Sequence, residues 1–185
     1  MGGILNKLKS DESLMLAYQR GDSTAFEVLY MRHKDALFGF LYRSCLRHSI
    51  AEELAHDAWT SIIRRVASYQ ATAAFKTYLF QVAHNKLIDY WRRNQNAALS
   101  IEFDERILPN NTETPLHCPE SQQLRVELRA AIENLPVDQR NTMLLREQGF
   151  SQEDIAAITG TERETVKSRL RYATQHLRDN MGVTQ

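Results

Sequence analysis

Apolar residues recur at steps of three and four along most of the first ninety positions, a spacing that predicts amphipathic helices. No proline occurs from Ser10 to Trp91, and glycine is nearly absent there, which further favours helix over strand. Four helices are predicted: one through Leu14, Ala17 and Tyr18 that ends at Gly21, one that begins at Asp22 or Ser23 and continues to Leu41, one over about 50–66, and one over about 75–90.

The pattern changes after Arg93. Residues 95–120 show no period and contain Pro109, Pro115 and Pro119, which predicts a flexible linker. The linker is acidic, since Glu102, Asp104, Glu105, Glu113 and Glu120 stand against Arg106 alone. Helical spacing resumes near residue 120 and continues to Leu135, where Pro136 interrupts it, and a further helix is predicted over 138–148. We therefore expect an all-α protein with two small helical domains, 1–94 and 121–185, joined by a flexible acidic linker over 95–120.

The segment 149–177 has the pattern of a helix-turn-helix. Ser151 precedes Asp154 by three residues and Thr161 precedes Glu164 by three, which is the spacing of a capping box at each helix start. Gly160 lies between the two starts. Two short helices that begin ten residues apart around a glycine turn form this motif, although an αα-hairpin would have the same layout.

The second of these helices has two distinct faces. Val166, Leu170, Ala173 and Leu177 form an apolar stripe, and Lys167 and Arg171 lie on another face. Residues 163–178 contain five cations and one anion. A cationic face with hydroxyl groups beside it suits the major groove of DNA, whereas an ordinary solvated helix mixes the signs more evenly.

Residues 75–93 interleave aromatic and basic side chains. Such a mixture suits single-stranded nucleic acid, because bases stack on rings while cations meet phosphates. The alternative is a core helix, and the spacing of Leu79, Val82, Ala83 and Leu87 indicates that one face is buried. On this alternative Phe80 and Trp91 are expected to be at least partly buried.

An acidic edge is predicted on the third helix, where Glu52, Glu53 and Asp57 lie together near His56. It is either a solvated face or a docking surface for a basic partner, and composition does not separate the two. The net charge of the whole chain is zero, so a charged partner would meet local patches.

The sequence gives little support for a catalytic, cofactor or metal site. No nucleophile motif or phosphate-binding glycine loop occurs. Cys45, His48, His117 and Cys118 could be imagined as zinc ligands, but adjacent His117 and Cys118 can hardly both chelate one ion. The two distant cysteines, with no signal peptide and no apolar run of ~20 residues, predict a cytoplasmic protein without membrane insertion.

Four segments, in order, resemble the bacterial extracytoplasmic-function (ECF) sigma factors, the minimal two-domain specificity subunits of RNA polymerase. RGDSTAFEVLYMRH (20–33) is similar to the opening of the family's first conserved region, and AEELAHDAW (51–59) to its polymerase-docking helix. FKTYLFQVAHNKLIDYWRR (75–93) is similar to the promoter-melting helix. The segment 135–170 is similar to the domain that contacts the upstream promoter element.

The resemblance implies partners and site residues. The partners are core RNA polymerase (the clamp of its largest subunit and the flap of its second-largest), promoter DNA and an anti-sigma factor. The polymerase-binding residues are Glu52, Glu53, His56 and Asp57. The −10 element would be contacted by Tyr69, Ala73, Ala74, Phe75, Asn85, Lys86, Arg92 and Arg93. The −35 element would be contacted by Arg146, Arg163, Lys167, Ser168, Arg171 and Tyr172.

Two other classes of function are consistent with the residues alone. One is a stand-alone helix-turn-helix regulator that binds duplex operator DNA as a dimer. The other is an enzyme built on the Cys and His residues. If the protein is a sigma factor, its two domains are expected to be held together or covered by a partner in the free state, and the acidic linker could fold over the cationic DNA faces.

Overall fold

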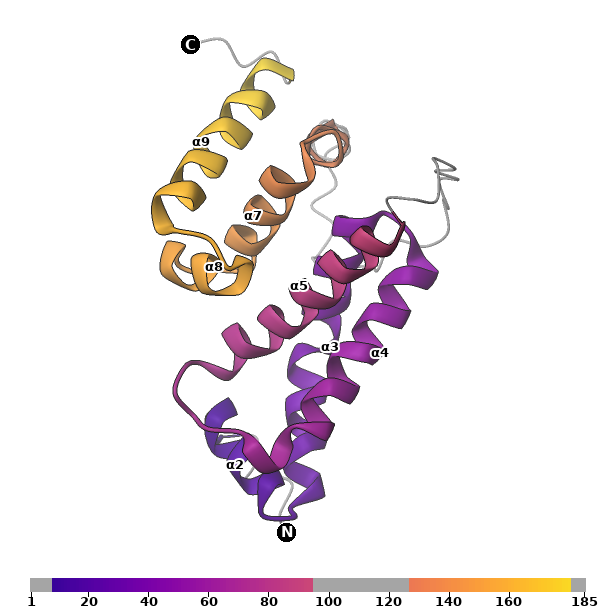
Figure 1. The fold of residues 1–185 in the computed structure, drawn as a ribbon, viewed down its shortest axis with the longest axis vertical. Helices are drawn as coiled ribbons and strands as arrows, with labels where there is room; N and C mark the ends of the chain where they lie inside the picture. Colours follow the sequence, from indigo (N-terminus) through magenta and orange to yellow (C-terminus); the bar gives the residue numbers. More distant parts are fainter. Residues whose placement is uncertain (1–7, 95–126, 181–185) are drawn as a thin grey trace, which may run out of the picture.

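The computed structural model describes residues 8–94, here the N-terminal part, and residues 127–180, here the C-terminal part. Every regular element in these two ranges is helical, which confirms the all-α prediction. The linker and its acidic residues lie outside the described ranges. The N-terminal part contains α2 (Asp11–Gln19), α3 (Ser23–Cys45), α4 (His48–Arg64), the short 3₁₀ helix η1 (Val66–Ser68) and α5 (Phe75–Asn94) (Figure 1). The C-terminal part contains a helical stretch over 127–133, then α7 (Val137–Glu147), α8 (Gln152–Thr159) and α9 (Arg163–Asn180).

Local capping explains where the first helices begin. The Ser10 hydroxyl accepts from the Ser13 N–H at the start of α2, and Asp22 Oδ1 accepts from the Thr24 and Ala25 N–H groups at the start of α3. Such bonds satisfy donors that the first turn of a helix leaves unpaired. The predicted boundary near Asp22 is therefore confirmed.

The first predicted capping box of the helix-turn-helix is confirmed, and the second is wrong. Ser151 and Asp154 form a reciprocal box at the start of α8. Gly160 ends α8 in the left-handed conformation, with φ of 64°, and the Thr161 N–H then donates to the Ala156 carbonyl. Because its backbone still closes α8, Thr161 does not cap α9, which begins two residues later at Arg163.

One contiguous apolar core extends through both parts. It includes the fully buried Phe40, Phe75 and Phe80, and in the C-terminal part Leu145 and Ile155. The stripe predicted for residues 75–90 is buried as expected, and Trp91 is half-buried against the core. The apolar stripe of α9 is also confirmed: Val166 and Ala173 are buried, and Leu170 and Leu177 pack against their neighbours.

The two parts pack against each other along α5 and α8 (Figure 1). The rings of Phe80 and Phe150 meet edge to face, with their centroids 4.9 Å apart. Around this contact, Lys76 Nζ donates to the Gln148 carbonyl at 2.6 Å, Thr77 Oγ1 to Asp154 Oδ1 at 3.0 Å and Gln81 Nε2 to the Ala157 carbonyl at 3.0 Å. In this arrangement the helix-turn-helix part covers one face of α5.

A second contact between the parts joins α3 to α7. The buried Arg140 guanidinium donates to the Ser44 carbonyl at the end of α3 and to the Glu133 carbonyl, both at 2.7 Å. At the surface Arg43 Nη1 lies 2.7 Å from both carboxylate oxygens of Glu147. Arg140 therefore caps α3 from the other part of the chain.

Candidate nucleic-acid and polymerase interfaces

The predicted −10 residues Tyr69, Ala73, Ala74 and Phe75 lie in or beside the 69–74 loop, which connects η1 to α5. Residues 70–74 are exposed, but Tyr69 is buried and Phe75 is fully buried. The Tyr69 ring contacts the rings of Phe75 and Tyr78, at centroid distances of 6.3 Å and 5.7 Å. Burial raises the pKa of Tyr69 to about 12. In this structure Tyr69 and Phe75 support the loop, and the residues between them, four of which have small side chains, are exposed.

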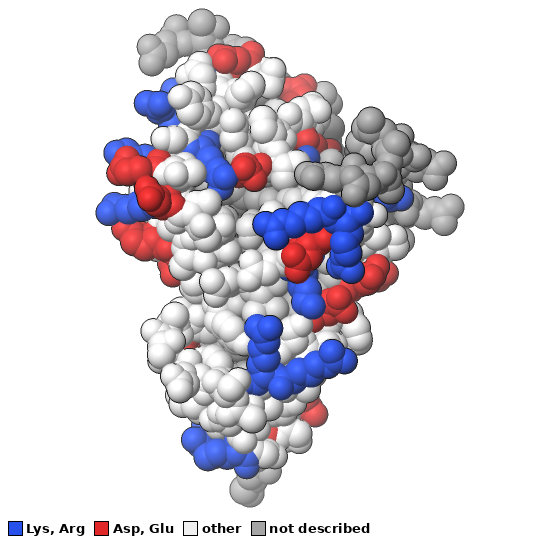
Figure 2. Space-filling model, viewed as in Figure 1, with Lys and Arg blue, Asp and Glu red and all other residues white. Residues whose placement is uncertain are grey.

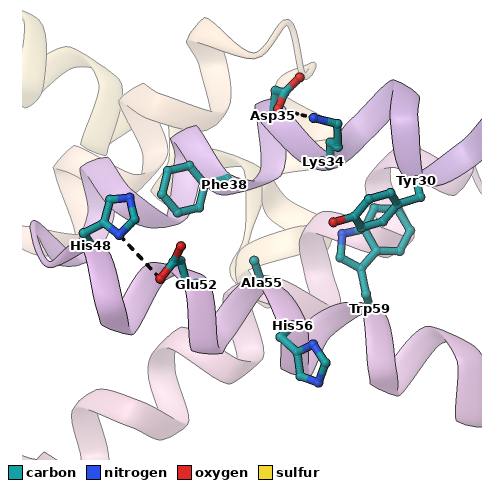
Figure 3. Close-up of a pocket in the computed structure, with 9 residues that line it drawn as sticks. All are labelled: Tyr30, Lys34, Asp35, Phe38, His48, Glu52, Ala55, His56 and Trp59. Carbon is teal, nitrogen blue, oxygen red and sulfur yellow. Dashed lines mark hydrogen bonds and ion pairs between the residues drawn. The ribbon is translucent and has the colours of Figure 1, made fainter. Parts of the chain in front are cut away.

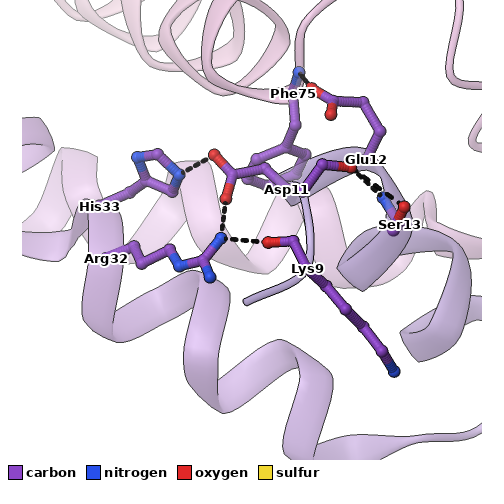
Figure 4. A network of polar contacts seen from close by, with 8 residues as sticks. Lys9, Asp11, Glu12, Ser13, Arg32, His33 and Phe75 are labelled. Carbon is purple, nitrogen blue, oxygen red and sulfur yellow. Dashed lines mark hydrogen bonds and ion pairs between the residues drawn. The ribbon is translucent and has the colours of Figure 1, made fainter. Parts of the chain in front are cut away.

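Side chains of α2 hold both ends of this loop. The Gln19 amide nitrogen donates to the carbonyls of Val66, Ala67 and Tyr69 at 2.9, 3.1 and 3.2 Å. At the other end, Glu12 Oε1 accepts from the Phe75 N–H at 2.8 Å (Figure 4). The sequence reasoning missed Glu12 and Gln19, because their partners lie 47 to 63 positions away and no local pattern predicts such contacts.

Asp11, the neighbour of Glu12, is held in place by a charged network. Asp11 accepts from Arg32 at 2.6 Å through one oxygen and lies 2.7 Å from His33 Nε2 through the other (Figure 4). The hydrogen bond from His33 is the main cause of the lowered pKa of Asp11, and the bond from the Phe75 N–H is the main cause of the lowered pKa of Glu12. Both carboxylates are therefore stabilised in the charged form.

The remaining predicted −10 residues extend along α5. Asn85, Arg92 and Arg93 are exposed, and Lys86 is half-buried. Arg92 lies 3.9 Å from Asp89, a weak surface pair. Lys76, one of the basic residues that interleave with the aromatic ones in 75–93, contacts the C-terminal part, where its ammonium lies 4.7 Å from the centre of the Phe150 ring.

The predicted −35 residues lie on α7 and α9. Lys167 and Tyr172 are well exposed, and the Arg171 guanidinium lies over the Tyr172 ring at 5.0 Å. Arg163 pairs with Glu153 at 3.0 Å, and Ser168 is half-buried. Arg146 donates to the Phe150 carbonyl at 3.0 Å and so braces the turn before α8.

The five cations of 163–178 do not all share one face. Arg169 is turned inward, where its guanidinium lies 2.7 Å from Asp138 of α7. Lys167 has Glu164 at 3.6 Å, one helical turn away. Acidic and basic side chains are also interspersed over the lobe that contains α9 (Figure 2). Arg163, Lys167, Arg171 and Arg178 are exposed, so a DNA contact through α9 would rest on four of the five cations.

Two of the four predicted polymerase-binding residues line a groove between α3 and α4. Its volume is about 420 Å³, and Glu52 and His56 are among its lining residues (Figure 3). Glu53 is exposed and Asp57 half-buried on the same helix. The other lining residues are Tyr30, Lys34, Asp35, Phe38, His48, Ala55 and Trp59.

Aromatic rings form the apolar part of the groove. Tyr30 and Trp59 meet edge to face at 5.2 Å, and the exposed fraction of Tyr30 is 40%. The sequence reasoning missed these rings, although Tyr30, Lys34 and Phe38 recur every four residues and so share one face of α3. An apolar hollow with acidic groups on its border suits a partner that presents both apolar and basic side chains.

The imagined metal ligands are only partly described. The Cys45 thiol donates to the Arg47 carbonyl at 3.3 Å, and His48 Nδ1 lies 3.5 Å from Glu52. His117 and Cys118 lie outside the described ranges. Within those ranges no group of three or more potential metal ligands occurs. No helix in the same ranges has the length and apolar character that crossing a membrane requires.

Two family models match the chain, one in each part. Sigma-70 region 2 matches residues 29–97, and Sigma-70 region 4 matches residues 125–177. Among curated relatives, the RNA polymerase sigma-H factor of Pseudomonas aeruginosa is 29% identical over 171 residues, which cover 88% of this chain and 89% of the relative. The ECF RNA polymerase sigma-E factor of Escherichia coli K12 is 29% identical over 170 residues, covering 87% and 88%.

Two solved structures have a similar fold. The sigma factor RpoE, in complex with the anti-sigma factor NepR from Bartonella quintana, superposes with a TM-score of 0.70 at 25% identity and covers 86% of this chain and 98% of its own. CnrH, in complex with the cytosolic domain of CnrY, superposes with a TM-score of 0.69 at 17% identity and covers 96% and 100%. The second likeness concerns the fold alone.

Proposed function

The chain belongs to the ECF sigma factors, and we propose that it binds core RNA polymerase, directs it to specific promoters and helps to melt the −10 element. The observation that supports this most is the order of region 2 and region 4 on one chain, the first containing α5 and the 69–74 loop and the second the helix-turn-helix. As a specificity factor the protein performs no chemistry of its own.

We propose that the groove between α3 and α4 docks on the clamp of the largest polymerase subunit. Glu52 and His56 line it, Glu53 and Asp57 lie on the same helix, and the aromatic rings of Tyr30 and Trp59 supply its apolar surface. The C-terminal part would contact the flap of the second-largest subunit, so that polymerase holds both parts at a fixed separation.

Promoter binding then becomes cooperative. Each part alone contacts DNA weakly, but once one element is bound the other contact is intramolecular and gains effective concentration. Contacts from α9 to the −35 element position the complex. Capture of an unstacked −10 base by the 69–74 loop and Asn85 would offset the few kcal/mol that unpairing costs.

An anti-sigma factor is proposed as the regulator. RpoE of Bartonella quintana, which resembles this chain over most of its length, was solved in complex with one. The packing of the helix-turn-helix against α5 in this chain is compatible with a stored, inactive state. The linker's acidic residues lie outside the described ranges, so their shielding role stays a prediction.

Reconstitution with core polymerase tests the proposal. We expect promoter-specific transcription only when the protein and core polymerase are both present. A stand-alone regulator would instead bind duplex operator DNA tightly as a dimer, without polymerase.

A charge reversal locates the docking surface. We expect Glu52→Lys to weaken binding to core polymerase, because it places a cation in the lining of a groove proposed to face basic groups. Glu27→Lys is the matched control, since Glu27 is also exposed but lies on α3 outside the groove lining. Equal binding by the two variants would contradict docking at this groove.

A further inference from the structure

We propose that α2 is part of the apparatus that selects the −10 base: Gln19 and Glu12 fix the two ends of the 69–74 loop and so determine which base it accepts. This inference rests on the proposed sigma-factor function and names residues that neither family model covers, because the region 2 match begins at residue 29.

Gln19 holds the first end of the loop. Its amide NH₂ lies within 3.2 Å of three carbonyls, those of Val66, Ala67 and Tyr69, which share its two protons. These carbonyls belong to η1 and to the residue that follows it, so the side chain fixes the point at which the chain leaves regular structure. Because these three carbonyls all contact one amide of α2, that amide defines the path of the backbone there.

Glu12 holds the second end. The residue before α5 is Ala74, whose methyl group cannot cap a helix, and the Tyr78 N–H already takes its carbonyl. Glu12 of α2 supplies the missing acceptor for the Phe75 N–H at 2.8 Å, and its negative charge also suits the positive end of the helix. The first turn of α5 is thus capped from another helix.

The loop between these two ends is built for contact with a ligand. Residues 70–74 are exposed, and the Tyr69 and Phe75 rings on either side are buried against each other. The Tyr69 hydroxyl is buried and has no hydrogen-bond partner within the described ranges. A loop whose ends are fixed by hydrogen bonds and whose centre is open is preorganised, and small displacements of such a site change what it binds.

A purely structural role for Gln19 and Glu12 is disfavoured by how α2 is attached. Leu14, Met15 and Ala17 already bury this helix in the core, and Leu14 and Met15 have no exposed surface. Glu12 and Gln19 are only half-buried and extend toward the loop from either end of the helix. Their polar contacts therefore serve the loop more than the attachment of α2.

The test uses holoenzyme reconstituted from the full chain and core polymerase. Promoters with each of the four bases at every −10 position are transcribed, and the ratio of the best to the worst base is measured at each position. Gln19→Glu keeps the shape of the side chain but replaces the donor with a carboxylate that faces three carbonyls. We expect the ratio at one or two positions to fall about tenfold, the scale of one base contact, while binding to core polymerase changes less than twofold.

A second set of variants keeps the test decisive if Gln19→Glu fails to fold. Glu12→Ala removes the acceptor for the Phe75 N–H, whereas Glu12→Gln retains an acceptor oxygen. We expect the base ratio to fall in the first and to persist in the second. Glu27→Ala is the matched control, an exposed acid of α3 that makes no hydrogen bond to the loop within the described ranges.

The outcomes separate this inference from the proposed function. If wild-type holoenzyme initiates with a clear −10 preference and folded Gln19→Glu and Glu12→Ala keep that preference unchanged, the role of α2 is overturned and the sigma-factor function stands. If wild-type holoenzyme shows no promoter preference, both are overturned. A reduced base ratio with unchanged polymerase binding supports the inference, because a general loss of structure would lower both.

Discussion

The Asp154 carboxylate of α8 accepts from the Thr77 hydroxyl of α5 at 3.0 Å through Oδ1, while its Oδ2 closes the capping box with Ser151. One side chain therefore starts the first helix of the helix-turn-helix and also joins that motif to the helix proposed to melt the promoter. Both hydrogen bonds lower the pKa of Asp154, that from Ser151 the more.

Removing the Thr77 hydroxyl is expected to loosen the packing of the two parts. Thr77→Val keeps the shape of this buried side chain and leaves Asp154 Oδ1 without its donor. The packing of the two parts is expected to weaken by about 1 kcal/mol, which lowers the ratio of chains with packed parts to chains with separated parts roughly fivefold. Energy transfer would measure that ratio, between dyes attached to cysteines that replace Glu53 and Gln175 in a chain whose native cysteines have been removed. Thr174→Val is the control, because the Thr174 hydroxyl bonds only within α9, to the Leu170 carbonyl.

The exposed cations of α9 are expected to differ in their effect on −35 binding. Arg171→Ala and Lys167→Ala should both weaken recruitment to the promoter, Arg171 the more, because its planar group can contact a base edge. Loss of a base contact costs ~1–3 kcal/mol and relaxes sequence preference, whereas loss of a phosphate contact weakens all sequences alike. Transcription from promoters with single −35 substitutions distinguishes the two.

Arg169→Ala provides the contrast for these variants. Arg169 pairs with Asp138 of α7, so its loss should lower the stability of the C-terminal part and leave −35 preference unchanged. Normal transcription by both Arg171→Ala and Lys167→Ala from the cognate promoter would mean that this face does not contact the −35 element.

Asn85→Ala is expected to impair formation of the open complex more than initial binding. Asn85 is exposed on α5, and its amide can both donate to and accept from the edge of an unpaired base. Permanganate footprinting on a duplex template and on one melted in advance over the −10 element would measure the effect. An equal defect on both templates would argue against a role specific to melting.

Acid is expected to destabilise the fold through His84. Burial, with a further contribution from Arg169 and opposition from Asp138, lowers the pKa of His84 to about 4. The unfolded chain binds this proton below about pH 6.5, so the stability that neutral His84 contributes is complete above that pH and is lost as the pH falls toward 4. The loss is about 1 kcal/mol per pH unit within this window.

Urea unfolding at several values between pH 7.5 and 5 would measure this slope. We expect His84→Gln to flatten it and His176→Gln, which changes an exposed histidine of α9, to preserve it. Asp11, Glu12 and Asp154 have lowered pKa values, so the stability they contribute is lost only below their ordinary values near 4, outside the measured range. An unchanged slope in His84→Gln would assign the pH dependence to another group.

Most of the helices could be predicted from the sequence because their signals are local. The cap at Asp22, the box at Ser151 and the glycine at 160 each act within one helical turn, and the structure has all three. The capping box predicted at Thr161 is absent, because the Thr161 N–H donates to the Ala156 carbonyl at the end of α8. A local sequence pattern does not show which of two adjacent capping motifs forms.

The candidate site was predicted less completely, because its geometry depends on contacts between distant segments. Arg169 looked like one more cation of the DNA-facing helix, and only its partner Asp138, 31 residues earlier, reveals that it points inward. Phe75, which is predicted to contact the −10 element, is fully buried in this structure, and the sequence did not show that burial. Arg140 had no sequence signal, although it reaches the Ser44 carbonyl from 96 residues away.

The attachment of the 69–74 loop to α2 bears on how promoter preference could be transferred between relatives. A chimera cut at residue 29, where the region 2 match begins, would import the loop but leave its Gln19 and Glu12 contacts to whatever the recipient has at those positions. The transplantable unit therefore begins upstream of Asp11. Grafts that include α2 should keep the donor's promoter preference, and grafts without it should lose part of that preference even when every loop residue is the donor's.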